Sequence, residues 1–348
     1  MHRPAEHTNG EEGVSVDLAG VEDGDLVIRI ANAYQGAIPT DLGSRDSFWF
    51  ESFEEMKRPI HRALVVDDGS LAAILRDPSS NILFYGFESL VLDGVGASPK
   101  AIYDNLLRVA EAVGALPLEL PEAYVLDKEP PPLRSVEQIL STLDQHFGFG
   151  VSFPNPYPHE TGLATSRGVA SYRAVQALYQ AWRIYQMAGL SGRVLEIGAG
   201  LGRTAFYARQ FGVKDYTIVD IPMTMVAQSY FLGRALGPES IRLFGEQPRK
   251  DAINILPPQD FLEKSDRYDL IVNIDSMTEM GRETAEDYWR AISARTSMFL
   301  SINHEHNSFT VRELTNPISD AKAGNGPKRT SRFPYWLRRG YVEETVEF

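Results

Sequence analysis

The sequence contains no cysteine, which excludes disulfides, thiolate zinc sites, iron–sulfur clusters and a cysteine nucleophile. It also lacks apolar runs of about 18 residues, and residues 1–13 lack the apolar core of a signal peptide. Basic residues are in deficit, because 34 Lys and Arg face 47 Asp and Glu for a net charge of −13. Such a surface repels nucleic-acid phosphates and anionic lipids, so we expect a cytoplasmic protein that binds neither nucleic acid nor membrane.

The residues that are present indicate an ordinary folded chain. Apolar residues make up 43% and charged residues 23% of the 348 positions, which disfavours long disorder and coiled coil. We expect residues 1–13 to be flexible and residues 14–150 to be mostly helical, because the apolar spacing in 98–116 and 135–146 is that of amphipathic helices. The segment 79–90 is compatible with strand or loop.

The second half, residues 151–348, alternates between strand and helix patterns. After a long helical pattern over 166–190, apolar runs predict strands, and helices are predicted between them. The predicted strands are 193–197, 216–220, 240–245, 268–274 and 297–303, and the predicted helices are 202–212, 223–237 and 282–296. This order predicts an α/β fold with a doubly wound, mostly parallel sheet. The closing run, 341–348, alternates apolar and acidic residues and predicts an antiparallel edge strand.

The strongest motif is a glycine-rich turn, Glu196-x-Gly198-x-Gly200-x-Gly202, after the first of these strands. Glycine has no Cβ and tolerates positive φ, so the backbone of such a turn can approach a ligand closely. The spacing departs from the G-x-G-x-x-G pattern of dinucleotide sites, because Arg203 follows Gly202. Glu196 also suits a positively charged ligand better than a pyrophosphate.

An acidic residue, Asp220, ends the next strand, about twenty residues after the glycine turn. Doubly wound nucleotide folds place there a carboxylate that accepts hydrogen bonds from both ribose hydroxyls. The alternative is that the glycines only pack a helix against a strand and that Asp220 caps the following helix. Two features at the expected separation favour the nucleotide site.

The glycine turn and Asp220 resemble those of class I S-adenosylmethionine-dependent methyltransferases. More narrowly, residues 30–348 resemble a bacterial family of sugar O-methyltransferases. That resemblance rests on LFYGFE (83–88), SRGVASYRAVQALYQAWRI (166–184), VLEIGAGLGRTAFYA (194–208), VDIP (219–222), NIDSMTEM (273–280) and RFPYWLRRGYVEE (332–344). It implies a Rossmann-like methyltransferase domain over 151–348. The region 14–150 would then shape the acceptor pocket as a lid or make a homodimer contact.

The resemblance implies S-adenosylmethionine as the methyl donor and S-adenosylhomocysteine as the product. It places the cofactor on the glycine turn, at the two strand ends that follow, and beside the start of the preceding helix. The expected cofactor-binding residues are Glu196, Gly198, Ala199, Gly200, Gly202, Asp220, Ile221, Asn273, Tyr172 and Arg173. For Tyr172 and Arg173 the alternatives are a buried phenol and a solvated arginine.

Two polar clusters follow later strands, where catalytic groups of doubly wound folds lie. An alcohol acceptor must lose its proton, which calls for a general base or a metal ion. Asp275 and Glu279 stand in the first cluster, where the alternative is helix capping. His304 and His306 flank Glu305 in the second, and histidine has a pKa suited to a general base.

The same side chains, Asp275, Glu279, His304, Glu305 and His306, could instead gather a divalent cation such as Mg²⁺. No pair of histidines at helical spacing supports a preformed metal site, so we expect no divalent metal. The sequence therefore predicts methyl transfer to a hydroxyl of a small molecule, a sugar or sugar-bearing secondary metabolite. The alternatives are N-methylation of a small amine and a non-catalytic cofactor-binding scaffold.

Overall fold

A computed structural model describes residues 23–38, 58–66, 69–77, 83, 98–118, 134–157, 160–315 and 327–348. The flexible segment expected at 1–13, and all of 79–90 except Leu83, lie outside these residues. Among the helices described, none combines the length and the apolar character needed to cross a membrane.

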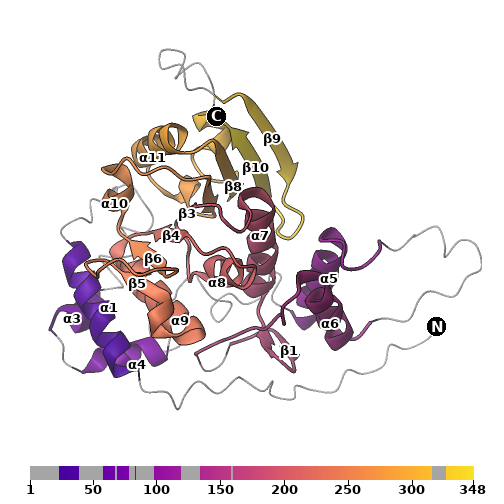
Figure 1. Cartoon of the computed structure of the whole chain (residues 1–348), viewed down its shortest axis with the longest axis horizontal. Helices are drawn as coiled ribbons and strands as arrows, with labels where there is room; N and C mark the ends of the chain where they lie inside the picture. Colours follow the sequence, from indigo (N-terminus) through magenta and orange to yellow (C-terminus); the bar gives the residue numbers. More distant parts are fainter. Residues whose placement is uncertain are drawn as a thin grey trace, which may run out of the picture.

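The centre of the molecule is one eight-stranded sheet (Figure 1). Its order is β5 (Ile241–Leu243), β6 (Ile253–Leu256), β4 (Tyr216–Val219), β3 (Val194–Ile197), β7 (Leu270–Ile274), β8 (Met298–His304), β10 (Tyr341–Glu347) and β9 (Arg329–Pro334). The first six strands pair in parallel, and β10 pairs antiparallel with both β8 and β9. This topology confirms the expected α/β fold with a mostly parallel sheet.

The outer edge of the sheet differs from the expectation. The closing strand β10 is antiparallel as predicted, but β9 covers it and forms the edge. Five of the six residues of β9 are exposed, and the strand carries Arg329 and Arg332, so it shows no apolar alternation. The short strand β6 was not predicted either, because its four residues follow no clear turn signal.

Helices cover both faces of the sheet. One face packs against α7 (Tyr172–Ala188), α8 (Arg203–Gln210) and α9 (Pro222–Leu236), and the other against α10 (Pro258–Leu262), α11 (Arg282–Arg295) and α12 (Val311–Leu314). Successive strand residues point to opposite faces, as Val194 and Leu195 do, and they enter two separate apolar cores. The sheet is therefore buried on both sides, which explains its continuous apolar strands.

Helix α7 begins later than the apolar pattern over 166–190 predicts. The residues before it form a hairpin of β1 (Leu163–Thr165) and β2 (Gly168–Ala170). Gly168 has φ +106°, and a Cβ there would lie 2.3 Å from the backbone oxygen of Phe153, so only glycine fits this turn. The hydroxyl of Ser171 then accepts a hydrogen bond from the backbone N–H of Ala174 and starts the helix.

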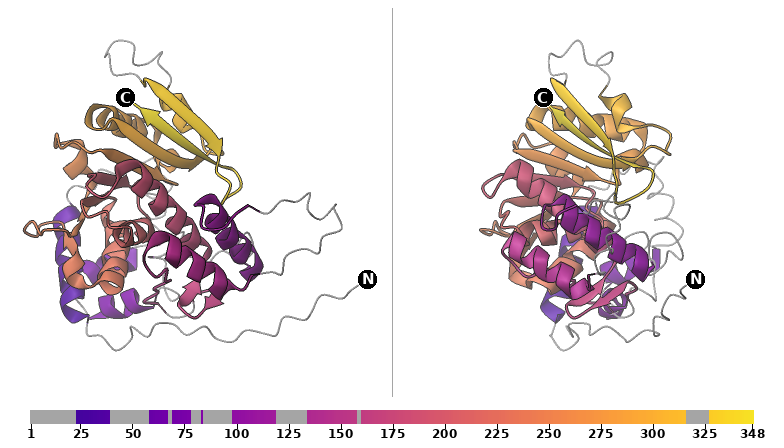
Figure 2. Two further views of the ribbon diagram at one scale, coloured as in Figure 1. Left: turned by 45° about the vertical axis from the view of Figure 1, so that its right-hand side comes forward. Right: turned by 90° about the vertical axis from the view of Figure 1, so that its right-hand side faces the viewer.

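The N-terminal helices form two groups at different places around the sheet (Figures 1 and 2). The first group, α1 (Gly24–Ala37), α3 (Arg58–Val66) and α4 (Ser70–Arg76), packs beside α9 and β5. The second, α5 (Pro99–Ala112) and α6 (Val136–Phe147), packs beside α7 and β1. The described part of 14–150 is thus helical, as expected.

One buried carboxylate, that of Asp23, ties the first helical group to the sheet domain. Its oxygens accept hydrogen bonds from the guanidinium of Arg76, from Arg234 at 3.0 Å and from the Tyr230 hydroxyl at 2.8 Å. The hydrogen bond from Arg76 is the main cause that lowers the pKa of Asp23 to about 2. Because Arg234 and Tyr230 belong to α9, this cluster fixes α1 and α4 against that helix.

Candidate active site

A cavity of about 570 Å³ opens at the carboxyl ends of β3, β4, β7 and β8. This is the edge where parallel doubly wound sheets bind ligands, and the volume falls within the range of about 300–1,000 Å³ for small-molecule sites. Ten of the residues predicted for the site line it: Arg173, Glu196, Gly198, Ala199, Gly200, Asp220, Ile221, Asp275, Glu279 and His304.

Four predicted site residues do not line the cavity: Tyr172, Gly202, Asn273 and His306. No described residue before Arg173 lines it either, so a lid function of the N-terminal helices stays a prediction.

The glycine turn leaves β3 with its backbone folded against the end of β7. Gly198 has φ +71°, and a Cβ at this position would lie 2.1 Å from the hydroxyl oxygen of Ser276. Gly200 also has positive φ, at +56°. Gly202, at φ +87°, caps the start of α8 and packs toward Leu232, so its role is to begin the helix. The turn is therefore built from positions that strongly favour glycine, and it presents backbone to the cavity.

Asp220 follows β4 and presents its carboxylate to the cavity. One oxygen accepts the backbone N–H of Ile221 at 2.9 Å, and the other accepts the amide of Gln228 at 2.5 Å. Both donors are neutral, so they orient the carboxylate without cancelling its charge. Gln228 was not predicted, although it lies on the helix that follows Asp220. Such a carboxylate can accept hydrogen bonds from a vicinal diol.

Glu196 lies deeper than the glycine motif suggests. Its side chain is 1% exposed, and it accepts a hydrogen bond from the Tyr216 hydroxyl at 2.8 Å. Burial raises the pKa of Glu196 to about 7. The residue thus forms the floor of the cavity, and its charge depends on pH near neutrality.

Asn273 holds strands together beneath the site. Its amide nitrogen donates to the backbone oxygen of Ile197 at 2.9 Å and to the hydroxyl of Ser276, and its oxygen accepts from Met277 and Asn303. The side chain is fully buried. These contacts join β3, β7 and β8, so the structure gives Asn273 a structural role.

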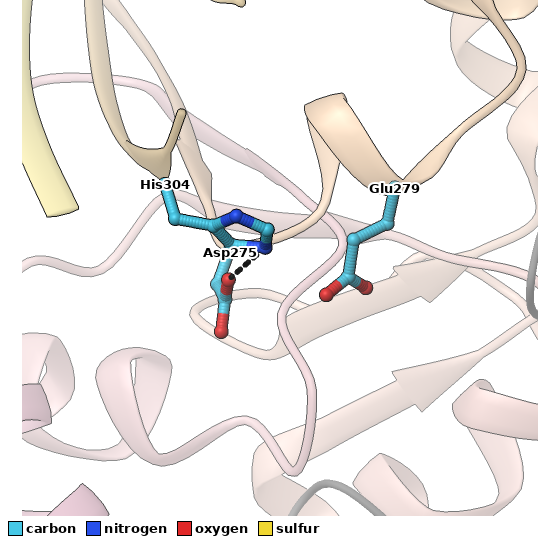
Figure 3. A group of neighbouring side chains, drawn as sticks. All are labelled: Asp275, Glu279 and His304. Carbon is cyan, nitrogen blue, oxygen red and sulfur yellow. Dashed lines mark ion pairs between the residues drawn. The ribbon is translucent and has the colours of Figure 1, made fainter. Parts of the chain in front are cut away.

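Asp275, Glu279 and His304 gather at the other end of the cavity, after β7 and β8 (Figure 3). One ligand atom of each lies within 4.8 Å of the others. The Nε2 atom of His304 is 3.9 Å from the Oδ1 atom of Asp275. Asp275 has φ +57°, an unusual conformation for a residue other than glycine, and such residues concentrate at functional sites.

The carboxylate of Asp275 is already engaged by other side chains. Arg338 donates to Oδ2 at 2.7 Å, the Tyr341 hydroxyl donates to Oδ1 at 2.6 Å, and Arg173 lies 3.7 Å from Oδ2. Two guanidinium groups beside this carboxylate oppose the approach of a divalent cation. Asp275 therefore acts as an anchor for its neighbours, and His304 is the better placed proton acceptor.

The two histidines of the second cluster separate in the structure. His304 is the last residue of β8 and lines the cavity, whereas His306 is exposed. The backbone N–H of His306 points to the Nδ1 atom of His304 at 3.4 Å, which leaves Nε2 on the side of Asp275. Glu305 is also exposed and pairs with Arg332 on β9.

The sequence analysis missed three cavity residues that shape this end: Gln176, Arg338 and Tyr341. Gln176 lies one helical turn after Arg173 on α7, and that spacing is the signal that could have found it. Arg338 and Tyr341 belong to the segment 332–344, which carried part of the family resemblance but no predicted role. Tyr172, in contrast, is a largely buried phenol whose pKa is raised mainly by burial.

No family model matches the chain. No curated protein matches it either. Among solved structures, the chain is similar to magnesium protoporphyrin IX methyltransferase from Synechocystis PCC 6803 with bound SAM, with 14% identity, 51% of this chain, 80% of that chain and a TM-score of 0.34. A ribosomal protein L11 methylase from Lactobacillus delbrueckii subsp. bulgaricus has 16% identity, with coverage of 50% and 78% and a TM-score of 0.33. The glycopeptide N-methyltransferase MtfA complexed with S-adenosyl-L-homocysteine has 13% identity, coverage of 49% and 89%, and a TM-score of 0.36. The fold class of this chain rests on its own strand order.

Proposed function

We propose that this chain is an S-adenosylmethionine-dependent methyltransferase that methylates a hydroxyl group of a small molecule, a sugar or sugar-bearing metabolite. The observation that carries the proposal is one cavity with a glycine turn and Asp220 at one end and His304 at the other. The first pair suits a nucleoside, because Asp220 can accept two ribose hydroxyls where the turn exposes backbone. The sugar acceptor comes from the resemblance of segments such as 166–184 and 332–344.

The charge of the cavity supports a cationic cofactor. The acidic side chains that line it are Asp220, Glu263, Asp275, Glu279 and Asp287, in addition to Glu196 on its floor. The basic ones are Arg173, Arg203 and Arg338, and Arg203 is itself paired with Glu160 at 2.7 Å. This excess of carboxylates favours a ligand with a positive charge, as a sulfonium has.

The residues of the chain would divide the work of the reaction. The cofactor supplies a sulfonium methyl, so that a carbon–oxygen bond forms as the carbon–sulfur bond breaks. His304 accepts the proton of the acceptor hydroxyl at a ring nitrogen. Asp275 keeps Arg338 and Tyr341 in place beside it, and the backbone of the glycine turn fixes the distance between the two ends.

Binding and transfer are tested separately. Calorimetry should show that S-adenosylmethionine and S-adenosylhomocysteine bind more tightly than NAD, and the opposite order would contradict the proposal. Transfer of a radiolabelled methyl group is then measured with matched alcohols, deoxy sugars and amines as acceptors. Labelling of amines in place of hydroxyls would favour N-methylation, and tight cofactor binding with no labelling of any acceptor would favour a scaffold.

A further inference from the structure

Helix α7 turns a polar stripe toward the cavity. Arg173, Gln176, Ala177 and Gln180 line it at positions i, i+3, i+4 and i+7 of the helix. Gln180 is held on both sides, since its amide oxygen accepts from Thr204 and its nitrogen donates to Tyr335. Arg173 and Gln176 are not held in this way.

Gln176 has a buried donor without an acceptor. The residue is 5% exposed, and its Nε2 atom makes no hydrogen bond to any described residue. Its side chain lies near the Tyr172 phenol on the same helix, but no hydrogen bond forms between them. Buried donors are almost always paired, so an unpaired one that lines a cavity points to an acceptor on a ligand.

Arg173 shares its only described partner. Its guanidinium lies 3.7 Å from Asp275, beyond hydrogen-bond distance, while Arg338 holds the same oxygen at 2.7 Å. The other oxygen of Asp275 is taken by the Tyr341 hydroxyl. One carboxylate thus faces two guanidinium groups, and the donors of Arg173 have no hydrogen-bonded acceptor within the described part of the chain.

We propose that Arg173 and Gln176 form a subsite for a carboxylate group of a ligand. A guanidinium fork and an amide donor, one helical turn apart, match the two oxygens of a carboxylate. Elsewhere the cavity carries unneutralised acids, such as Asp220 and Glu263, which would repel an anion. The inference deepens the proposed function, on which it rests, because the carboxylate belongs either to the amino-acid part of the cofactor or to an acidic acceptor such as a uronic acid.

The first experiment tests the cofactor as the source. Binding of S-adenosylhomocysteine is compared with binding of its decarboxylated analogue, which differs only in the carboxylate. We expect the wild type to prefer the carboxylate by about ten- to hundredfold, the size of a charge-assisted hydrogen bond. That preference should fall to about twofold or less in Arg173→Met, and it should invert in Gln176→Glu, which places a like charge in the subsite.

The second experiment tests the acceptor as the source. Glucuronate and glucose are titrated into wild type and Arg173→Met, with and without saturating S-adenosylhomocysteine. A preference for glucuronate that is lost in the variant, together with an unchanged preference for S-adenosylhomocysteine over its analogue, assigns the subsite to an acidic acceptor.

The control is Arg183→Met, on the same helix but outside the cavity, where Arg183 pairs with Glu343. It should leave both preferences unchanged, and thermal melting verifies that each variant is folded. If the preferences of Arg173→Met and Gln176→Glu equal those of the wild type, the subsite is excluded. Failure of S-adenosylhomocysteine to bind the wild type contradicts the proposed function instead, and the glucuronate titration without cofactor still tests the subsite.

Discussion

The two ends of the cavity are each built around an aspartate that follows a parallel strand, and the two aspartates differ in their surroundings. Asp220 receives neutral donors, an amide and a backbone N–H, so its charge remains available to a ligand. Asp275 receives two guanidinium groups and a phenol, and its backbone is in the left-handed region. Equivalent positions at a sheet edge thus give one ligand acceptor and one anchor, which is decided by distant partners.

The largest effect should come from removing the base at the acceptor end. We expect His304→Ala to reduce the rate of methyl transfer by about 10²–10⁴, because the acceptor proton then has no positioned acceptor. The affinity for S-adenosylhomocysteine, measured by calorimetry, should change by less than about twofold.

The matched control is His306→Ala, since His306 is exposed and does not line the cavity. It should retain the wild-type rate. An equal loss of rate in both variants would mean that the structure does not separate the two histidines correctly.

Glu196 provides a test beneath the two ends. Its folded-state pKa of about 7 exceeds the ordinary value of 4.5, so the folded chain binds this proton more tightly than the unfolded chain. The stabilisation is present below pH 4.5 and is lost as the pH rises to about 7. Relative to Glu196→Gln, the free energy of unfolding of the wild type should therefore fall over this window by about 3 kcal/mol.

Denaturant unfolding of both proteins at a series of pH values measures this difference, because all other titrating groups are shared. Parallel stability curves would show that Glu196 ionises normally and is not enclosed as described.

At the cofactor end, Asp220→Ala should weaken the binding of S-adenosylmethionine by about ten- to hundredfold, which corresponds to the loss of charged hydrogen bonds. The comparison with Asp275→Asn sharpens the test, because Asp275 is expected to hold Arg338 and Tyr341 and not the ribose. If Asp275→Asn weakens binding more than Asp220→Ala does, the two ends have been assigned in the wrong order.

The smallest effect is expected from metal removal. Dialysis against EDTA should change the rate of methyl transfer by less than about twofold, because Arg338 and Arg173 already oppose the charge of Asp275. Loss of turnover that Mg²⁺ restores would make Asp275, Glu279 and His304 metal ligands.

The features predicted from sequence are those encoded locally. The glycine turn and Asp220 lie within one strand–helix–strand unit, and the parallel strands show as apolar runs because both faces of the sheet are buried. The partners of Asp275 could not be found in this way. Arg338 and Tyr341 lie 63 and 66 residues from it, and only the antiparallel register of β10 against β8, with Tyr341 opposite His304, brings them to the cavity.

Other differences have equally specific causes. The strand pattern could not tell that β8 ends at His304, which decides that His306 points away from the site. The edge strand β9 is mostly exposed, so its residues carry no apolar signal. The polar residue Asn273 was predicted to bind a ligand, but its four hydrogen bonds all go to neighbouring strands and turns.

The Asp23 cluster has a consequence for how the chain reaches its native state. Its bonds to Tyr230 and Arg234 span 207 and 211 residues, so they close a loop that includes most of the sheet. During synthesis, α1 leaves the ribosome long before α9 exists, and until then the Asp23 carboxylate has no Arg234 to meet. Contacts of such sequence separation form late and slow folding. The first described helix of the chain should therefore be among the last to dock.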